Sequence, residues 1–128
     1  EATKVANAAE QSAGVAPQKP LITYEDFEKM DIRIGTILSA EKMPKADKLL
    51  VLRVDTGIDE RTIVSGIAQS FDPQEIVGKR VTVLANLAPR KLRGVESQGM
   101  ILMVENSEGK YRFIAPDAEG VKNGTEVK

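Results

Sequence analysis

Apolar and polar residues alternate in several short stretches of the chain, and this period-two pattern predicts β-strands rather than helices. The first predicted strand runs from Ile32 to about Glu41, and Gly35 within it predicts a bulge or a bend. Further strands are predicted at Leu50–Val54, Arg61–Ser65, Arg80–Leu87, Met100–Glu105 and Tyr111–Ala115.

Two short helices are predicted from capping residues. Thr23 is placed to cap an N-terminal helix, with Asp26 three residues later as its reciprocal partner. The segment Asp72-Pro73-Gln74-Glu75 places a cap, a first-turn proline and a reciprocal acid in order, and Gly78 ends the helix.

The resulting order is strand, strand, strand, short helix, strand, strand, which is the order of the OB-fold. A small SH3-like barrel would contain similar strands. We therefore predict an all-β chain: a five-stranded OB-fold barrel with a short helix between strands 3 and 4, an N-terminal helix and a C-terminal extension.

Residues 1–21 are rich in Ala, Gln and Ser and carry Pro17 and Pro20, without a sustained apolar face. This composition predicts a linker that joins residues 22–128, the folded domain, to a part of a longer protein that precedes them.

Composition excludes most catalytic chemistry. The chain of 128 residues contains neither Cys nor His, so thiol nucleophiles, imidazole bases and the usual zinc ligands are absent. An enzyme would have to rely on Asp, Glu, Lys, Ser or Tyr, and no paired carboxylates occupy convergent loop positions. We predict no catalytic residue, no metal and no cofactor. No apolar run is long enough for a membrane span, and the absence of Cys favours the cytoplasm.

The net charge of −1 conceals an uneven distribution. Residues 1–31 carry three basic and six acidic side chains. Between residues 76 and 95 every charged side chain is basic, namely Lys79, Arg80, Arg90, Lys91 and Arg93.

The segment 86–100 lies between two apolar runs and places Arg90, Lys91 and Arg93 beside Pro, Gly and Ser. We interpret it as a basic loop whose cations and free backbone donors bind an RNA backbone. A solvated loop that only keeps the protein soluble is the alternative.

A second basic segment, the turn from Lys42 to Lys48, carries Lys42, Lys45 and Lys48 around Pro44. The first and fourth inter-strand loops of an OB-fold lie near one binding face, so this turn is expected to extend the basic loop.

The aromatic residues are few: Tyr24, Phe27, Phe71, Tyr111 and Phe113. Phe27 and Phe71 adjoin helix caps and are expected in the core. The first three strands offer no aromatic platform on which bases could stack, which favours recognition of the backbone and shape of a folded RNA.

Four blocks resemble the tRNA-binding domain family, and they occur in the family's order: Asp31–Ile37, Ala46–Leu49, Ile63–Ile67 and Asn86–Met100. The family occurs at the C-terminus of bacterial methionyl-tRNA synthetases, which this chain resembles most. It also occurs in free-standing tRNA-binding proteins, in the endothelial monocyte-activating polypeptide type and in the phenylalanyl-tRNA synthetase beta chain. Phe71 stands where the family pattern has Tyr.

The resemblance implies an OB-fold, a homodimer formed partly through the segment after the barrel, and recognition of tRNA by shape. It also implies that Asn86, Ser97 and Met100 lie on the tRNA-binding face. From the residues alone, Asn86 and Ser97 are as well suited to turn chemistry, and Met100 to the core of its strand.

We therefore expect a non-catalytic, dimeric tRNA-binding module appended to a methionine–tRNA ligase whose catalytic domain is not in this chain. A free-standing tRNA-binding protein is one alternative. A secretion chaperone of the same fold, which offers an apolar groove to peptides, is another.

Overall fold

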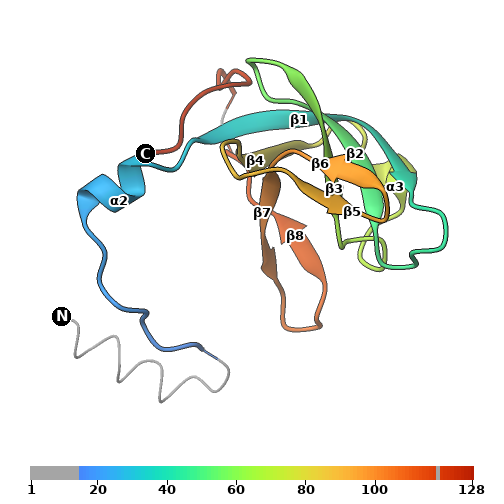
Figure 1. Cartoon of the computed structure of the whole chain (residues 1–128), viewed down its shortest axis with the longest axis horizontal. Coiled ribbons are helices and arrows are strands. Elements are labelled where there is room, and N and C mark those ends of the chain that lie inside the picture. The colour runs from blue at the N-terminus through green and yellow to red at the C-terminus, as the bar shows by residue number, and fades with distance from the viewer. Residues whose placement is uncertain (1–14, 118) are drawn as a thin grey trace.

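The computed structural model describes residues 15–117 and 119–128, which form mainly antiparallel β-structure (Figure 1). The principal sheet has six strands in the order β3-β2-β1-β4-β7-β8 and curves strongly. Its strands are β1 Ile32–Lys42, β2 Leu50–Asp55, β3 Glu60–Ser65, β4 Arg80–Leu84, β7 Met100–Glu105 and β8 Tyr111–Phe113.

The predicted mainly-β fold is confirmed, together with the predicted order of strands and helix. β7 has the predicted bounds, whereas β4 ends three residues before Leu87 and β8 ends two residues before Ala115. The chain leaves β4 early because Asn86 turns away to bond the segment that precedes β1.

The inward face of the curved sheet forms the core. Leu50, Leu52 and Val54 of β2 are fully buried and pack with Ile63 of β3 and Val83 of β4. Each such side chain stabilises the fold by about 1.5–3 kcal/mol through removal of apolar surface from water.

β1 is shared between two neighbours. Its first half pairs with β4 and its second half with β2, and the register shifts between Ile37 and Ser39. The predicted irregularity at Gly35 is therefore misplaced. Gly35 is required for a different reason, because a Cβ there would lie 2.8 Å from the carbonyl oxygen of Asp55.

Both predicted helices are present. α2 (Tyr24–Glu28) has a capping box in which Thr23 and Asp26 each accept a hydrogen bond from the other's backbone N–H. α3 (Pro73–Ile76) follows Asp72 and inserts Ile76 into the core.

The two phenylalanines beside the caps differ in burial. Phe71 packs against the core and stacks on Phe113 with ring centroids 4.7 Å apart. Phe27 is only half-buried, and α2 has no buried residue, because this helix projects from the sheet (Figure 1). The prediction of Phe27 as a core residue is wrong for that reason.

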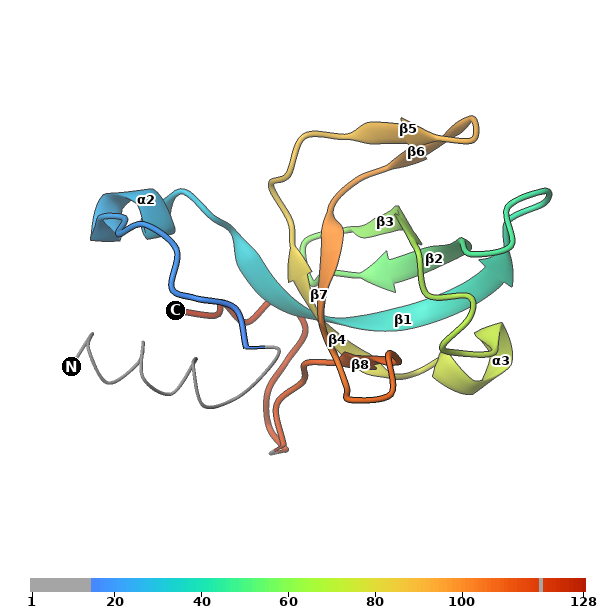
Figure 2. The same ribbon diagram turned by 90° about the horizontal axis from the view of Figure 1, so that it is seen from below.

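The C-terminal segment returns to the free edge of β1, next to α2 (Figure 2). Gly124 N–H donates to the Ile34 carbonyl at 2.7 Å, and Val127 N–H donates to the Ile32 carbonyl at 2.8 Å. The predicted C-terminal extension therefore behaves as a short edge strand, which covers backbone groups that β2 leaves unpaired.

Residues 1–14 of the predicted linker lie outside the described residues. Residues 15–21, which complete it, form neither helix nor strand. Within the described ranges, no helix is long and apolar enough to cross a membrane.

Candidate nucleic-acid interface

The segment 86–100 contains a β-hairpin that the sequence pattern did not predict. β5 (Arg90–Leu92) pairs with β6 (Val95–Ser97), and the two-residue turn is Arg93-Gly94, with φ of 53° and 86°. Positive φ at both central residues is the geometry of a type I′ turn, which Asn-Gly marks most clearly. With Arg in place of Asn the turn is hard to recognise, and the segment resembles a loop.

Ser97 fixes the hairpin to the principal sheet. Its hydroxyl accepts a 2.9 Å hydrogen bond from the Val64 N–H of β3, and the residue is only 5% exposed. The Gln98 N–H donates to the Thr62 carbonyl at 2.8 Å, two residues before Val64 in the same strand. Of the two roles considered for Ser97 from the sequence, a hydrogen bond to the backbone fits this arrangement better than an exposed position on the tRNA-binding face.

The hairpin and the turn 42–48 are joined by a second, small apolar cluster. Met43 and Ala46 of the turn are buried with Val64, and Leu92 and Val95 of the hairpin pack against them. Because the same side chains anchor both segments, their tips extend beyond the same end of the sheet (Figure 2). The expected proximity of the two basic segments is present in the structure.

The predicted cations lie around these two tips. All six are exposed: Lys42, Lys45, Lys48, Arg90, Lys91 and Arg93. Across the described chain the ion pairs are Lys29–Asp26, Arg33–Asp31 and Arg61–Asp59, so none involves these six. Lys91 lies directly opposite Glu96 in the hairpin register, which partly offsets its charge.

A groove of about 320 Å³ opens between the hairpin, the end of β3 and β7. Its lining is mainly apolar, with Arg90 at one side. Met100 is 43% exposed and lines this groove, so it is not the core residue that its place at the start of β7 suggested.

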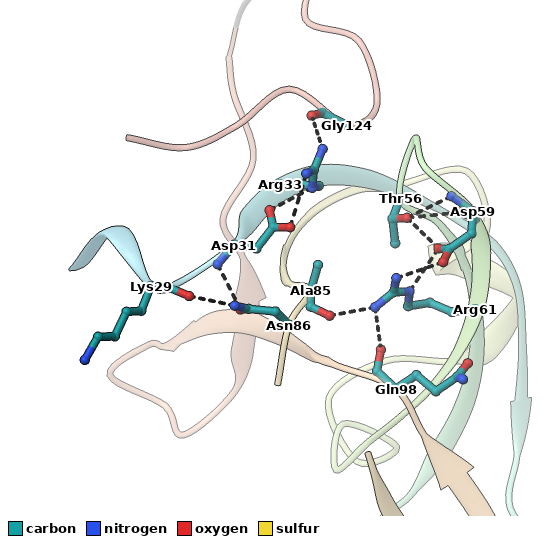
Figure 3. A network of polar contacts seen from close by, with 10 residues as sticks. All are labelled: Lys29, Asp31, Arg33, Thr56, Asp59, Arg61, Ala85, Asn86, Gln98 and Gly124. Carbon is teal, nitrogen blue, oxygen red and sulfur yellow. Dashed lines mark hydrogen bonds and ion pairs between the residues drawn. The ribbon is translucent and has the colours of Figure 1, made fainter. Parts of the chain in front are cut away.

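Asn86 lies away from the groove lining and uses both ends of its amide within the protein (Figure 3). Its Nδ2 donates to the Lys29 carbonyl at 2.6 Å, and its Oδ1 accepts from the Asp31 N–H at 2.9 Å. The side chain thereby ties the end of α2 to the start of β1. This is the turn chemistry that the sequence offered as its alternative role.

Arg61, which no sequence pattern marked as a site residue, holds both ends of the segment 86–100 (Figure 3). Its guanidinium donates to the Ala85 carbonyl at 2.7 Å and to the Gln98 carbonyl at 3.3 Å. It also forms an ion pair with Asp59 at 2.8 Å. No local pattern marks an arginine whose partners are distant in sequence.

The Arg61 guanidinium, through its hydrogen bond, holds the pKa of Asp59 below its ordinary value, and the Thr56 hydroxyl adds to this effect. Burial opposes the shift. Across residues 15–117 and 119–128, no three acidic side chains gather closely enough to hold a metal ion.

The sequence of this chain is similar to a described protein family and to several curated proteins. The family described as putative tRNA binding domain matches residues 32–126. The methionine–tRNA ligase of Flavobacterium johnsoniae is 72% identical over 125 residues, which are 98% of this chain and 17% of that protein. The chain thus spans less than a fifth of the curated relatives it matches.

Solved structures with the same fold include proteins of two kinds. The methionyl-tRNA synthetase related protein from Pyrococcus horikoshii superposes with a TM-score of 0.78 at 41% identity, covering 86% of this chain and all of that one. The chaperone CsaA from Bacillus anthracis gives a TM-score of 0.75 at 25% identity, covering 85% of this chain and all of that one.

Proposed function

Because the chain belongs to the tRNA-binding domain family, we propose that it binds tRNA non-catalytically through the hairpin 90–97, the turn 42–48 and the groove between the hairpin, β3 and β7. The observation that carries this proposal is the fixed position of two basic tips at one end of the sheet. None of these cations forms an ion pair within the described residues, so they are available to phosphate, and their contacts release counterions from the RNA.

The chemistry of this surface favours the backbone and fold of the RNA over its sequence. Arg90, Lys91 and Arg93 supply charge-assisted donors for phosphate oxygens, and Lys42, Lys45 and Lys48 supply a second group of cations. The groove offers apolar area, with Met100 and Arg90, for a ribose or an unpaired base. Asn86 and Ser97 support this surface by holding its framework in place.

The test measures binding of bulk bacterial tRNA at several salt concentrations, with a Lys91→Ala/Arg93→Ala double variant. We expect the parent chain to lose affinity steeply with salt, and the double variant to show a salt slope smaller by about 1.4–1.8. A Lys29→Ala/Lys110→Ala variant is the matched control, because it removes the same charge away from both tips. Equal binding by parent and double variant at low salt contradicts the proposal.

We further propose that the parent protein is a cytoplasmic methionine–tRNA ligase and that this chain raises tRNA concentration beside its catalytic domain. A tethered weak site strengthens overall binding by about 10²-fold or more without adding a catalytic contact. Removal of this domain from the full-length protein is expected to raise KM for tRNA while the rate of methionyl-adenylate formation stays unchanged. A loss of adenylate formation on removal would contradict a purely accessory role.

We also propose that the chain forms a homodimer through α2 and the C-terminal segment. Apolar side chains that monomers usually bury are exposed there, including Leu21 at 86%, Tyr24 at 69% and Met30 at 45%. Tyr24 and Met30 line a hollow of about 420 Å³ together with Val127. A second copy docking there would leave both pairs of basic tips free, because α2 lies at the opposite end of the molecule (Figure 2).

Sedimentation equilibrium of the parent and of Leu21→Asp/Tyr24→Asp tests the dimer. We expect a dimer for the parent and a monomer for the variant, since charges in a buried contact are costly. Val104, which is 52% exposed on β7, provides a matched control as Val104→Asp. A parent chain that remains monomeric at high concentration contradicts this proposal.

A second candidate function is peptide binding in the groove, as a chaperone. The apolar lining of the groove and the similarity to the CsaA structure favour it. Binding of an unfolded apolar peptide that is indifferent to salt and lost in Met100→Asp would support this candidate. Competition by tRNA would show that both ligands use the same surface.

A further inference from the structure

Two cations have an unusual backbone conformation. Among the described residues, the non-glycine positions with positive φ are Lys45, at 62°, and Arg93, at 53°. For residues with a Cβ this left-handed conformation is unfavourable, because the Cβ crowds the following carbonyl oxygen. Both residues stand at the tips of the two segments that form the proposed RNA surface.

At Lys45 the local geometry calls for glycine. The Ala46 N–H donates to the Met43 carbonyl at 3.3 Å, so residues 43–46 form a β-turn with Pro44 and Lys45 in its centre. Proline followed by a residue with positive φ is the arrangement of a type II turn, whose third position favours Gly or Asn. Lys45 occupies that position instead.

At Arg93 the same departure occurs in a different turn. The first central residue of a two-residue type I′ hairpin is usually Asn, Asp or Gly. Arg93 stands there, although the adjacent Gly94 shows that the turn can hold glycine. Neither turn therefore uses the residue that would be most stable.

Residues packed in the small apolar cluster lie next to both turns and hold the backbone of Lys45 and Arg93 in place. Met43 and Ala46 flank the Pro44-Lys45 pair and are 5% and 8% exposed. Leu92 and Val95 flank the hairpin turn and pack on the same small cluster. A backbone that is already fixed loses little conformational entropy when its side chain binds a ligand.

We infer that Lys45 and Arg93 form a two-point clamp for phosphates of one RNA, and that their left-handed backbone is kept because it directs both cations outward from the tips. This inference rests on the proposed function and makes it more specific. Strain at positions where it does not serve packing is typical of sites held for binding. The remaining cations of the surface add further contacts around the clamp, and each is expected to contribute less to affinity than Lys45 or Arg93.

The test compares Lys45→Gly and Arg93→Gly with the parent in thermal unfolding and in binding of bulk bacterial tRNA. We expect each substitution to raise the unfolding midpoint by about 2–5 °C, because glycine relieves the left-handed strain. We expect each to weaken tRNA binding at least about tenfold, as loss of a charge-assisted hydrogen bond does.

Lys48→Gly is the matched control, because it removes an exposed cation from the same turn at a position without positive φ. It should not raise the midpoint, and it should weaken binding by only about twofold. The exchange Arg93→Gly/Gly94→Arg keeps the net charge and moves the cation by one residue. It should bind as weakly as Arg93→Gly. An added Cβ at residue 94 meets no atom within 4 Å, but the φ of 86° there strains any residue other than glycine, so the unfolding midpoint of this variant should fall below that of Arg93→Gly.

Each outcome decides between distinct conclusions. If the glycine variants are more stable but bind no worse than Lys48→Gly, the clamp is refuted while the basic surface stands. If the unfolding midpoint falls, the left-handed conformation is not a strain held for binding, and the inference fails. If the parent chain itself does not bind tRNA, the proposed function fails. A higher unfolding midpoint together with a selective loss of tRNA affinity, in both Lys45→Gly and Arg93→Gly, supports the clamp. If Arg93→Gly/Gly94→Arg does not fold, Lys45→Gly is sufficient for the test.

Discussion

Replacement of Ser97 by Ala separates a structural role from a role in RNA contact. The substitution removes one oxygen atom and leaves the packing of Cβ unchanged. That oxygen accepts the hydrogen bond from the Val64 N–H at 2.9 Å, in a position where Val64 is 8% exposed and Ser97 is 5% exposed. The backbone donor would then lack a partner in a place that water reaches poorly.

The expected cost follows from that geometry. A buried donor left without its acceptor destabilises a protein by about 1–3 kcal/mol. The second contact of the hydroxyl, with the Gly99 carbonyl at 3.4 Å, is too long to add much. In a chain of this length the unfolding midpoint should therefore fall by roughly 3–12 °C.

Urea unfolding measures the loss in free energy, and amide hydrogen exchange at Val64 localises it. Exchange at that amide should accelerate more than exchange in β1, since the hairpin loosens before the sheet opens. Ser65→Ala is the control, because Ser65 is similarly shielded at 8% and no described backbone N–H depends on its hydroxyl. Ser65→Ala should lower the free energy of unfolding clearly less than Ser97→Ala does.

Measurement of tRNA binding by Ser97→Ala can refute the structural role of Ser97. If the structural role is correct, Ser97→Ala binds tRNA with modestly reduced affinity that follows its reduced stability. An unchanged free energy of unfolding, combined with a large loss of affinity, would show that the hydroxyl contacts the RNA directly. The assignment of Ser97 to the framework would then be wrong.

Three further predictions concern contacts between different segments of the fold. Asp59→Asn should flatten the acid side of the stability–pH profile: the lowered pKa of Asp59 contributes stability above the ordinary carboxyl pKa of about 4, and this is lost as pH falls through the lowered value. Circular dichroism melts between pH 2 and 7 measure this, and an unchanged profile would contradict the importance of Arg61. Gly57→Ala should lower the free energy of unfolding in urea more than Gly78→Ala does. Both glycines have φ of 91°, but only a Cβ at Gly57 meets the C-terminal segment, at 2.4 Å. Equal losses of unfolding free energy would argue against that close contact. Leu92→Ala should weaken tRNA binding without removing charge, because it loosens the hairpin from the turn 42–48. Filter binding at low salt measures the affinity, and an unchanged affinity would contradict this prediction.

Local patterns predicted the elements well where one residue type determines one geometry. Thr23 with Asp26, and Asp72 with Glu75, marked both helix starts because caps act within one turn of the chain. The alternation at Leu50, Leu52 and Val54 identified the buried face of a strand, because side-chain direction in a strand has a period of two. The same charges that drew attention to segments 42–48 and 86–100 lie exposed at one end of the sheet.

Other features depend on contacts between distant residues and had no local mark. Arg93-Gly94 concealed a hairpin because its arginine occupies a conformation that usually selects Asn or Gly. Asn86 and Ser97 have side chains equally suited to an RNA and to a backbone group, and only the proximity of Lys29 and Val64 showed which partners they have within the protein.

The sequence by itself determined the strands of the principal sheet, the helix caps, the placement of positive charge and the absence of Cys and His chemistry, but not the hairpin of β5 and β6. Tertiary structure alone decided which polar side chains remain free for a ligand. The physical reason is that hydrogen-bonding capacity belongs to the residue type, whereas the partner that uses it is supplied by the fold. Within residues 15–117 and 119–128, the cations of the basic tips form no ion pair, whereas Asn86 and Ser97 bond backbone groups of the protein.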